Sequence, residues 1–270
     1  MKHKSRYITA VKIGMLFVAA YLFGHFSAVA VDYLQPEAVE ASADGNWGLS
    51  FQQEGEPPVA NASAEELAKY DAYYAEITDE KVLYLTFDAG YENGNVEKIL
   101  DALKKHNAQG AFFVLEHLVK CNTPLVRRMA EEGHLVCNHT AKHPDMSRIT
   151  DKTLFCKQLS ALEKVYADCT GREMAPFYRP PEGRFSKQNL RYAEEEGYTT
   201  VFWSYAYADW DNNRQPDPER AIAQILAHTH PGMVILLHPT SATNAKIMDR
   251  LLTAWEQDGY RFGSLEELRK

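Results

Sequence analysis

The chain has 270 residues, of which 45% are apolar and 24% are charged. This composition is typical of a globular protein with a large core, and it excludes extensive disorder, collagen-like repeats and a multispan membrane protein. The formal net charge is −8. Residues 1–30 contain four basic and no acidic residues, so the rest of the chain holds 25 basic residues against 37 acidic ones. A body this acidic repels a phosphate backbone, which argues against nucleic-acid binding.

The N-terminus has the three parts of a secretory leader. Basic residues come first, the uncharged run 13–24 follows, and Ala28-Val29-Ala30 fits a cleavage site. The alternative is an uncleaved membrane anchor, since residues 13–31 are nearly long enough to span a bilayer. Either reading predicts that the polar body is exported and that the chain meets a membrane only through this segment.

The four cysteines lie in the part of the chain that is expected to be exported, where disulfides are chemically permitted. Three pairings are open for Cys121, Cys137, Cys156 and Cys169. Free thiols are the alternative, because a core of this size needs no covalent cross-links. No CxxC pair is present, which argues against a zinc knuckle.

The segment that follows the leader has no hydrophobic periodicity. Residues 31–62 are rich in Gly, Pro, Ser and acidic residues, which indicates a linker or an irregular wrap over the domain. Ser63 and Glu66 form a capping-box pattern and predict a short helix that runs to about Tyr74. We therefore expect a signal peptide or anchor at residues 1–30, a linker with a short helix at 31–75, and the main domain at 76–270.

From residue 82 onward, apolar runs alternate with amphipathic stretches, a pattern typical of a parallel α/β sheet, open or closed. The predicted strands are 82–87, 111–115, 135–138, 200–204 and 233–237. The predicted helices are 96–106, 123–133, 153–168, 186–196, 218–227 and 242–257. In such sheets ligands bind at the carboxyl ends of the strands, so the residues that follow each strand are informative.

Titratable side chains follow four of these strands: Asp88, His139 with His143, Asp209 and His238. Each has an ordinary structural alternative, such as a helix cap for an aspartate or a hydrogen-bonded histidine at the rim of the core. The two histidines four residues apart would face the same way on a helical turn, where they could hold one divalent cation. Four such placements together indicate a site.

A further motif, 178–183, is a proline-rich turn that carries Arg179, whose guanidinium is suited to orienting a carboxylate. In chain order, the motifs TFD-x-G, H-T-x-x-H, R-P-P-x-G, D-W and L-L-H resemble the five motifs of the polysaccharide deacetylases, the NodB-homology or family 4 carbohydrate esterase domain, over residues 81–268. Within that family the motifs look most similar to the delta-lactam-biosynthetic de-N-acetylases of spore-forming Gram-positive bacteria.

The resemblance implies a distorted (β/α) barrel and metal-assisted amide hydrolysis. It implies that His139 and His143 hold a divalent metal, usually zinc, which polarises the N-acetyl carbonyl. Asp88 would be the general base, Arg179 would orient it, and His238 would protonate the departing amine. A backbone N–H near Glu182 would help to hold the oxyanion. The expected substrate contacts are Trp210, Leu237, Glu182 and Arg184.

The chain departs from the family pattern at three positions. Ala89 stands where the family has a second aspartate that ligates the metal, which leaves two protein ligands. Ala206 stands where many members have an aspartate that tunes the catalytic histidine, and Asp209, three residues on, is not assumed to replace it. The usual His-Asp of the last motif is His238-Pro239.

The function that the resemblance implies is removal of the N-acetyl group from N-acetylmuramic acid in peptidoglycan glycan strands, leading to muramic δ-lactam in the spore cortex. The enzyme is expected to be an exported monomer. Arg179, Arg184 and Lys142 are the cations that could meet the lactyl carboxylate. The alternatives are deacetylation of N-acetylglucosamine in peptidoglycan or chitin-like glycans, and a non-catalytic wall-binding barrel.

Overall fold

The computed structural model describes residues 45–269. The predicted leader at residues 1–30 and the first part of the predicted linker lie outside them. Within the described range, no helix combines the length and the apolar character that crossing a bilayer requires.

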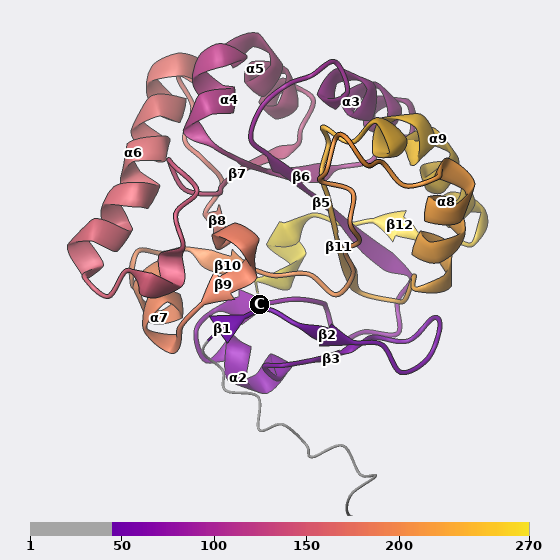
Figure 1. Ribbon diagram of the computed structural model, residues 1–270, viewed down its shortest axis with the longest axis horizontal. Helices are drawn as coiled ribbons and strands as arrows, with labels where there is room; N and C mark the ends of the chain where they lie inside the picture. The colour runs from indigo at the N-terminus through magenta and orange to yellow at the C-terminus, as the bar shows by residue number, and fades with distance from the viewer. Residues whose placement is uncertain (1–44, 270) are drawn as a thin grey trace, which may run out of the picture. The chain divides into compact units, whose positions relative to one another are not determined.

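The centre of the fold is a parallel sheet (Figure 1). Its hydrogen-bonded order is β11-β5-β6-β7-β8-β10-β4, and β12 pairs with β5 beside this path. Every pairing in this sheet is parallel. The strands are β4 (Ala72–Tyr73), β5 (Val82–Ala89), β6 (Gly110–Val114), β7 (Leu135–Asn138), β8 (Phe177–Tyr178), β10 (Thr199–Val201), β11 (Met233–Leu237) and β12 (Arg261–Phe262).

The two ends of this strand order approach each other. An isolated bridge joins Tyr205, which follows β10, to Ile235 in β11, and another joins Ala75, which follows β4, to Met233. The sheet therefore curls toward closure, although no continuous ladder joins its ends. The predicted α/β fold, a distorted barrel of parallel strands, is confirmed.

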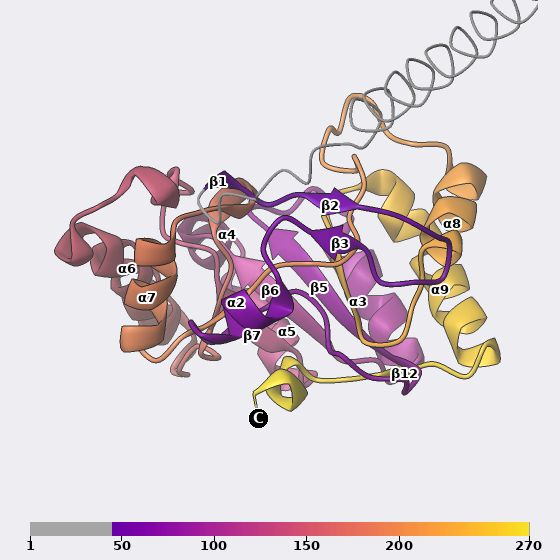
Figure 2. The same cartoon turned by 90° about the horizontal axis from the view of Figure 1, so that it is seen from below.

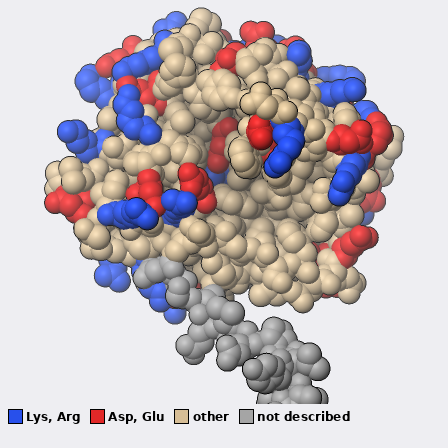
Figure 3. Space-filling model, viewed as in Figure 1, with Lys and Arg blue, Asp and Glu red and all other residues tan. Residues whose placement is uncertain are grey.

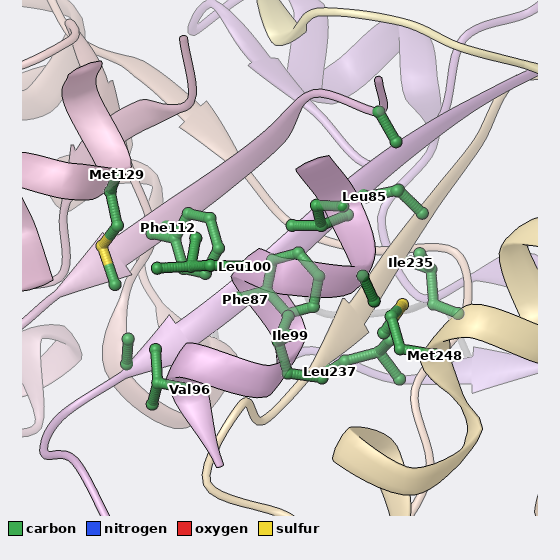
Figure 4. Packing of buried hydrophobic residues seen from close by; sticks show 14 of the residues in the cluster. Leu85, Phe87, Val96, Ile99, Leu100, Phe112, Met129, Ile235, Leu237 and Met248 are labelled. Atoms are coloured by element: carbon green, nitrogen blue, oxygen red, sulfur yellow. The ribbon is translucent and has the colours of Figure 1, made fainter. Parts of the chain in front are cut away.

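Helices pack around the outside of the sheet (Figure 1). They are α3 (Val96–Lys105), α4 (Glu116–Cys121), α5 (Thr123–Glu131), α6 (Lys152–Thr170), α7 (Lys187–Glu195), α8 (Pro218–Ala227) and α9 (Ala242–Gln257). The largest apolar cluster lies between the sheet and this layer, where Phe87 and Phe112 stack with ring centroids 4.8 Å apart (Figure 4). The apolar stripe of each helix and the apolar runs of the strands thus account for the core.

Residues 45–75 pack on the domain (Figure 2). They form β1 (Gly45–Asn46), β2 (Leu49–Ser50), β3 (Val59–Ala60) and α2 (Ala64–Ala68) before β4. Trp47 is buried and stacks on Phe202 at 4.5 Å. Helix α2 is capped by Ser63 as predicted but ends well before Tyr74, because Asp71 is left-handed (φ 46°) and residues 72–73 pair with β10.

Short elements complete the chain: β9 (Arg184–Phe185), which pairs with β1, and the 3₁₀ turns η1 (Met146–Arg148), η2 (Pro181–Gly183) and η3 (Leu265–Leu268). All four cysteines lie in the described range and are free thiols, and of these Cys137 is buried and Cys121 is exposed. The structure therefore corresponds to the unpaired alternative for the cysteines.

A histidine bridges α3 and α9. His106 Nδ1 lies 2.9 Å from Glu256 Oε2, and its Nε2 lies 2.9 Å from Asp249 Oδ1, which also pairs with Lys105. Both ring nitrogens can donate to carboxylates only when the imidazole is protonated. Burial opposes protonation, but the bonds to the two carboxylates raise the pKa of His106 above its ordinary value.

We expect this bridge to stabilise the fold at low pH. Because the folded-state pKa of His106 is raised, its contribution is complete below the unfolded pKa of about 6.5 and is lost as the pH rises through the folded pKa. The carboxylates are partly exposed, so the effect is modest, about 1 kcal/mol or less. Thermal unfolding of wild type and His106→Gln should differ by a few degrees at pH 5.5 and converge at pH 9. A difference that grows with pH would contradict this.

Candidate active site

A cavity of about 950 Å³ opens where the strands end, and the titratable residues predicted from the sequence meet in it. Asp88 lies at the end of β5, and the histidines 139 and 238 directly follow β7 and β11. The cavity is lined by Asp88, Gly90, Tyr91, Leu115, His139, His143, Glu182, Trp203, Ala206, Tyr207, Ala208, Trp210, Leu236, His238 and Thr240.

The charge of the cavity is concentrated in acids and histidines. None of the described residues that line it is a lysine or an arginine. The space-filling view shows a face that is hollowed near its centre, with acidic atoms inside the hollow and Lys and Arg atoms around it (Figure 3). The basic side chains of this face therefore lie mainly outside the hollow.

The buried guanidinium of Arg179 donates a hydrogen bond to Asp88. The guanidinium is fully buried, and its Nη1 donates to Asp88 Oδ1 at 2.9 Å. Its remaining bonds run to Thr86 Oγ1 and to the carbonyls of Val201 and Phe202, and its Cζ lies 4.2 Å from the centre of the Phe113 ring. These bonds hold the guanidinium in one position, and its Nη1 therefore orients the Oδ1 atom of Asp88.

The carboxyl of Asp88 is ionised in this setting. Burial opposes ionisation, but the surrounding positive charges, including that of Arg179, and the hydrogen bond from Arg179 lower its pKa below the ordinary value. One oxygen of Asp88 is bonded to Arg179, whereas the other, Oδ2, lies 3.5 Å from His139 Nε2. The arrangement therefore leaves one anionic oxygen facing the cavity.

His139 and His143 converge, but not through a helical turn. Residues 139–143 form a loop in which Thr140 (φ 74°) and His143 (φ 55°) are left-handed, a conformation that is strained for side-chain-bearing residues. The loop is held by a bond from the Thr140 N–H to Asn138 Oδ1 and by one from the His143 N–H to Thr140 Oγ1. The ring centroids lie 5.0 Å apart.

The chemistry of this pair suits a divalent metal. His139 Nδ1 lies 2.9 Å from the Arg179 carbonyl and donates to it, which leaves the Nε2 lone pair directed to the Asp88 side. Burial lowers the pKa of His139 to about 4, so the ring is the neutral form that metals bind. Within residues 45–269, no group of three or more His, Cys, Asp or Glu side chains forms a complete ligand set.

Ala89 adds no ligand. Its methyl group is fully buried in the largest apolar cluster, and the residue does not line the cavity. The residues that fit a metal are thus the two imidazoles, with the Asp88 carboxylate beside them.

His238 is held by Asp209. The His238 Nδ1 lies 2.7 Å from Asp209 Oδ1, and its backbone N–H donates to Asp209 Oδ2 at 2.8 Å. Asn244, in α9, also donates to Asp209 Oδ2 and to the His238 carbonyl. With Nδ1 bonded to the carboxylate, Nε2 is the ring nitrogen left to act in the cavity.

Nothing in the sequence pattern identifies Asp209 as the replacement for the aspartate missing at Ala206, yet its buried carboxylate lies 2.7 Å from His238 Nδ1. Burial lowers the pKa of the imidazole, but the hydrogen bond and charge of Asp209, with a further contribution from Asp88, raise it above the ordinary value. Asp209 therefore favours the protonated form of His238.

The four predicted substrate contacts divide into two pairs. Trp210 and Glu182 line the cavity. Leu237 does not, because strand alternation turns its side chain into the apolar core and presents Leu236 to the cavity instead. Arg184 also lies outside the lining, where its guanidinium pairs with Glu182 and Asp145.

Several residues of the site had not been predicted. Thr86 bonds to Arg179, Asn244 bonds to Asp209, and Tyr91 lines the cavity. Tyr91 carried a signal that could have found it, since it lies in the loop that follows Asp88. Asn244 lies in the first turn of α9 and carried no such signal.

The chain is similar to known proteins over most of its length. The family model for polysaccharide deacetylase matches residues 75–201. The peptidoglycan-N-acetylmuramic acid deacetylase PdaA of Bacillus subtilis is 42% identical over 224 residues, which are 83% of this chain and 85% of that protein. Its solved structure, described as a family 4 carbohydrate esterase, matches with a TM-score of 0.79 and 40% identity over 83% of this chain and 96% of that one.

A peptidoglycan-N-acetylglucosamine deacetylase, PgdA of Listeria monocytogenes, is 34% identical over 70% of this chain and 39% of that longer protein. Similarity of this extent, together with the common fold, assigns the family. The chain is a member of the polysaccharide deacetylases, enzymes that hydrolyse the amide bond of N-acetyl groups on carbohydrates.

Proposed function

We propose that this protein removes the N-acetyl group of N-acetylmuramic acid in peptidoglycan outside the cytoplasm, and that muramic δ-lactam is the eventual product. The observation that carries the proposal is the 42% identity to PdaA over 85% of that protein, combined with a cavity that brings together an ionised carboxylate and a protonatable histidine. The proposed domain arrangement is an N-terminal export segment ahead of a single catalytic domain, which acts as a monomer on glycan strands.

Asp88 acts as the general base in this proposal. Its Oδ1 is bonded to Arg179 and its Oδ2 is free to take a proton from an attacking water. Because the pKa of Asp88 is lowered, the carboxylate is available at neutral pH, and Arg179 keeps it oriented. A backbone N–H near Glu182 would stabilise the developing oxyanion.

His238 acts as the general acid. An amine is a poor leaving group unless it is protonated as the C–N bond breaks. The bond from His238 Nδ1 to Asp209 fixes the ring and raises its pKa, so that Nε2 can deliver that proton. The lowered pKa of Asp88 and the raised pKa of His238 support this division of roles.

Members of this family are generally metal-dependent, and His139 and His143 are the residues that would hold a divalent cation, which we propose to be zinc. When bound, such an ion polarises the acetyl carbonyl and lowers the pKa of water. With only two imidazoles and an adjacent carboxylate available, we expect weaker metal retention than in a site with three protein ligands.

The metal assignment predicts the behaviour of His143→Ala. This variant should lose bound zinc and activity together, and excess zinc should restore part of the activity if affinity is the limiting factor. Metal content measured by mass spectrometry after dialysis provides a readout that does not depend on turnover. The matched control is His117→Ala, which removes an exposed imidazole from α4. Unchanged zinc content in His143→Ala would contradict the assignment.

A second candidate is deacetylation of N-acetylglucosamine. The observation that favours it is the absence of any lysine or arginine among the described residues that line the cavity, since a muramic lactyl group carries a carboxylate. The sugar-facing aromatic residues Trp203, Tyr207 and Trp210 suit either sugar.

The two candidates are separated by acetate release from chitin oligosaccharides, which contain only glucosamine units, and from peptide-free peptidoglycan strands. Both are measured with the full chain and added zinc, and fragmentation assigns each acetyl group lost from the peptidoglycan strands to muramic acid or to glucosamine. The proposal expects a higher kcat/KM on the peptidoglycan strands. Activity on the chitin oligosaccharides alone would replace it with the second candidate. A folded, metal-loaded protein that is inactive on both would indicate a wall-binding barrel.

A further inference from the structure

If the protein acts on muramic acid, as proposed above, its cavity must accept the negatively charged lactyl group of that sugar. Binding this carboxylate requires a cationic side chain near the cavity. Muramic acid differs from glucosamine by a lactyl ether on C3, next to the N-acetyl group on C2. Its carboxylate therefore lies close to the reacting amide. A site that accepts it near Asp88 and Glu182 needs a compensating positive charge.

Of the three cationic side chains that the sequence offers for the lactyl carboxylate, Arg179 and Lys142 are already paired with other groups of the protein. Arg179 is fully buried behind Asp88, and its guanidinium donates to four protein acceptors. Lys142 does not line the cavity and pairs with Glu116 at 3.2 Å, with 69% of its side chain exposed. Neither presents a free donor to the cavity.

Arg184 differs from these two cations because it pairs with Glu182, which lines the cavity. Its Nη2 lies 3.0 Å from Glu182 Oε2, and its Nη1 lies 3.1 Å from Asp145 Oδ2. The backbone of Arg184 is fixed by pairing of β9 with β1, opposite Asn46. Asp145 thus anchors one edge of the guanidinium, while the other edge meets the carboxylate of a cavity-lining residue.

The backbone around Glu182 is rigid. Glu182 is left-handed (φ 57°), and Gly183 follows with φ 66°. A Cβ at Gly183 would lie 2.7 Å from the Cβ of Trp47 and 2.8 Å from the ring of Trp203, so both side chains pack directly against the turn. The side chain of Glu182 is by contrast 57% exposed, and an exposed ion pair of this kind is easily exchanged.

We propose that Arg184 is the receptor for the lactyl carboxylate and that Glu182 occupies the same edge of its guanidinium when substrate is absent. On binding, the substrate carboxylate replaces the Glu182 carboxylate at Nη2, and the Glu182 side chain turns into water. Asp145 keeps the guanidinium in place during the exchange. The Glu182 carboxylate then competes with the substrate carboxylate for Arg184 and weakens the binding of muramic acid. Arg184 provides the positive charge on which that binding depends.

The test compares KM and kcat on peptide-free glycan strands and on the same strands with their lactyl groups converted to methyl esters. Arg184→Gln should raise KM on the free-acid strands about tenfold, with little change in kcat and no change on the esters. Glu182→Gln should lower KM on the free-acid strands about two- to fivefold. Arg148→Gln is the matched control, because Arg148 also pairs with Asp145 but is exposed and makes no contact with Glu182.

Equal effects of Arg184→Gln on acid and ester strands, in an enzyme that deacetylates muramic acid, would overturn the inference and leave the proposed function intact. A rise in KM on the free-acid strands for Glu182→Gln would also overturn it. Wild-type protein that removes acetyl groups from glucosamine alone would overturn the proposed function and this inference together.

Discussion

Asp88→Asn should lower kcat by a factor of about 10²–10⁴ with a smaller change in KM, because it removes the general base and keeps a side chain of the same shape. The amide oxygen can still accept from Arg179 Nη1, so the bonds that hold the buried guanidinium remain. Acetate release under saturating substrate provides the rate, and thermal unfolding reports whether the fold is intact.

The control for Asp88→Asn is Asp101→Asn, which removes an equal charge from a carboxylate that is 69% exposed and pairs with Arg128. This control should retain wild-type kcat. A folded Asp88→Asn protein with more than about a tenth of wild-type activity would exclude Asp88 as the base.

Asp209→Asn should give the second-largest loss, about 10²-fold in kcat at neutral pH, by acting through His238. Asp209 raises the pKa of His238, so its removal lowers that pKa, and less of the general acid is protonated at a given pH. The alkaline limb of the kcat profile should therefore move to lower pH. An amide in this position also no longer enforces the tautomer that leaves Nε2 for the substrate.

A double-mutant cycle separates this role from simple loss of structure. If Asp209 acts only through His238, the Asp209→Asn/His238→Gln protein should be no slower than His238→Gln alone. Additive losses would mean that Asp209 contributes elsewhere, for example by holding α9 through Asn244.

The sequence predicted the long elements well, because each has enough residues to show its period. The predicted bounds of β7, β11, α8 and α9 agree with the structure. The two-residue strands β4 and β8 were missed, since two residues carry no periodicity and their pairing depends on β10.

The site was predictable where it depends on strand ends and unpredictable where it depends on loops. Strand ends bring Asp88, His139 and His238 to one cavity. The i,i+4 spacing of the histidines predicts convergence on a helical turn, whereas the loop reaches it through left-handed Thr140 and His143. That conformation depends on tertiary contacts that no local pattern encodes.

The Asp209–His238 contact illustrates the same limit. Asp209 lies in the irregular segment after β10, so its position relative to β11 does not follow from any repeat in the sequence. The bonds from His238 and from Asn244 in α9 determine where its carboxylate lies. The position of Asp209 therefore depends on tertiary contacts among three separate segments of the chain.

The most direct test of the proposed function is mass spectrometry of peptide-free glycan strands after incubation with the full chain and zinc, with and without chelator. Fragmentation locates each lost acetyl group on muramic acid or on glucosamine, and a subsequent loss of water at the same muramic residue reports lactam closure. We expect chelator-sensitive loss of acetyl at muramic acid. Acetyl loss confined to glucosamine, or no loss with a folded and metal-loaded protein, would contradict this account.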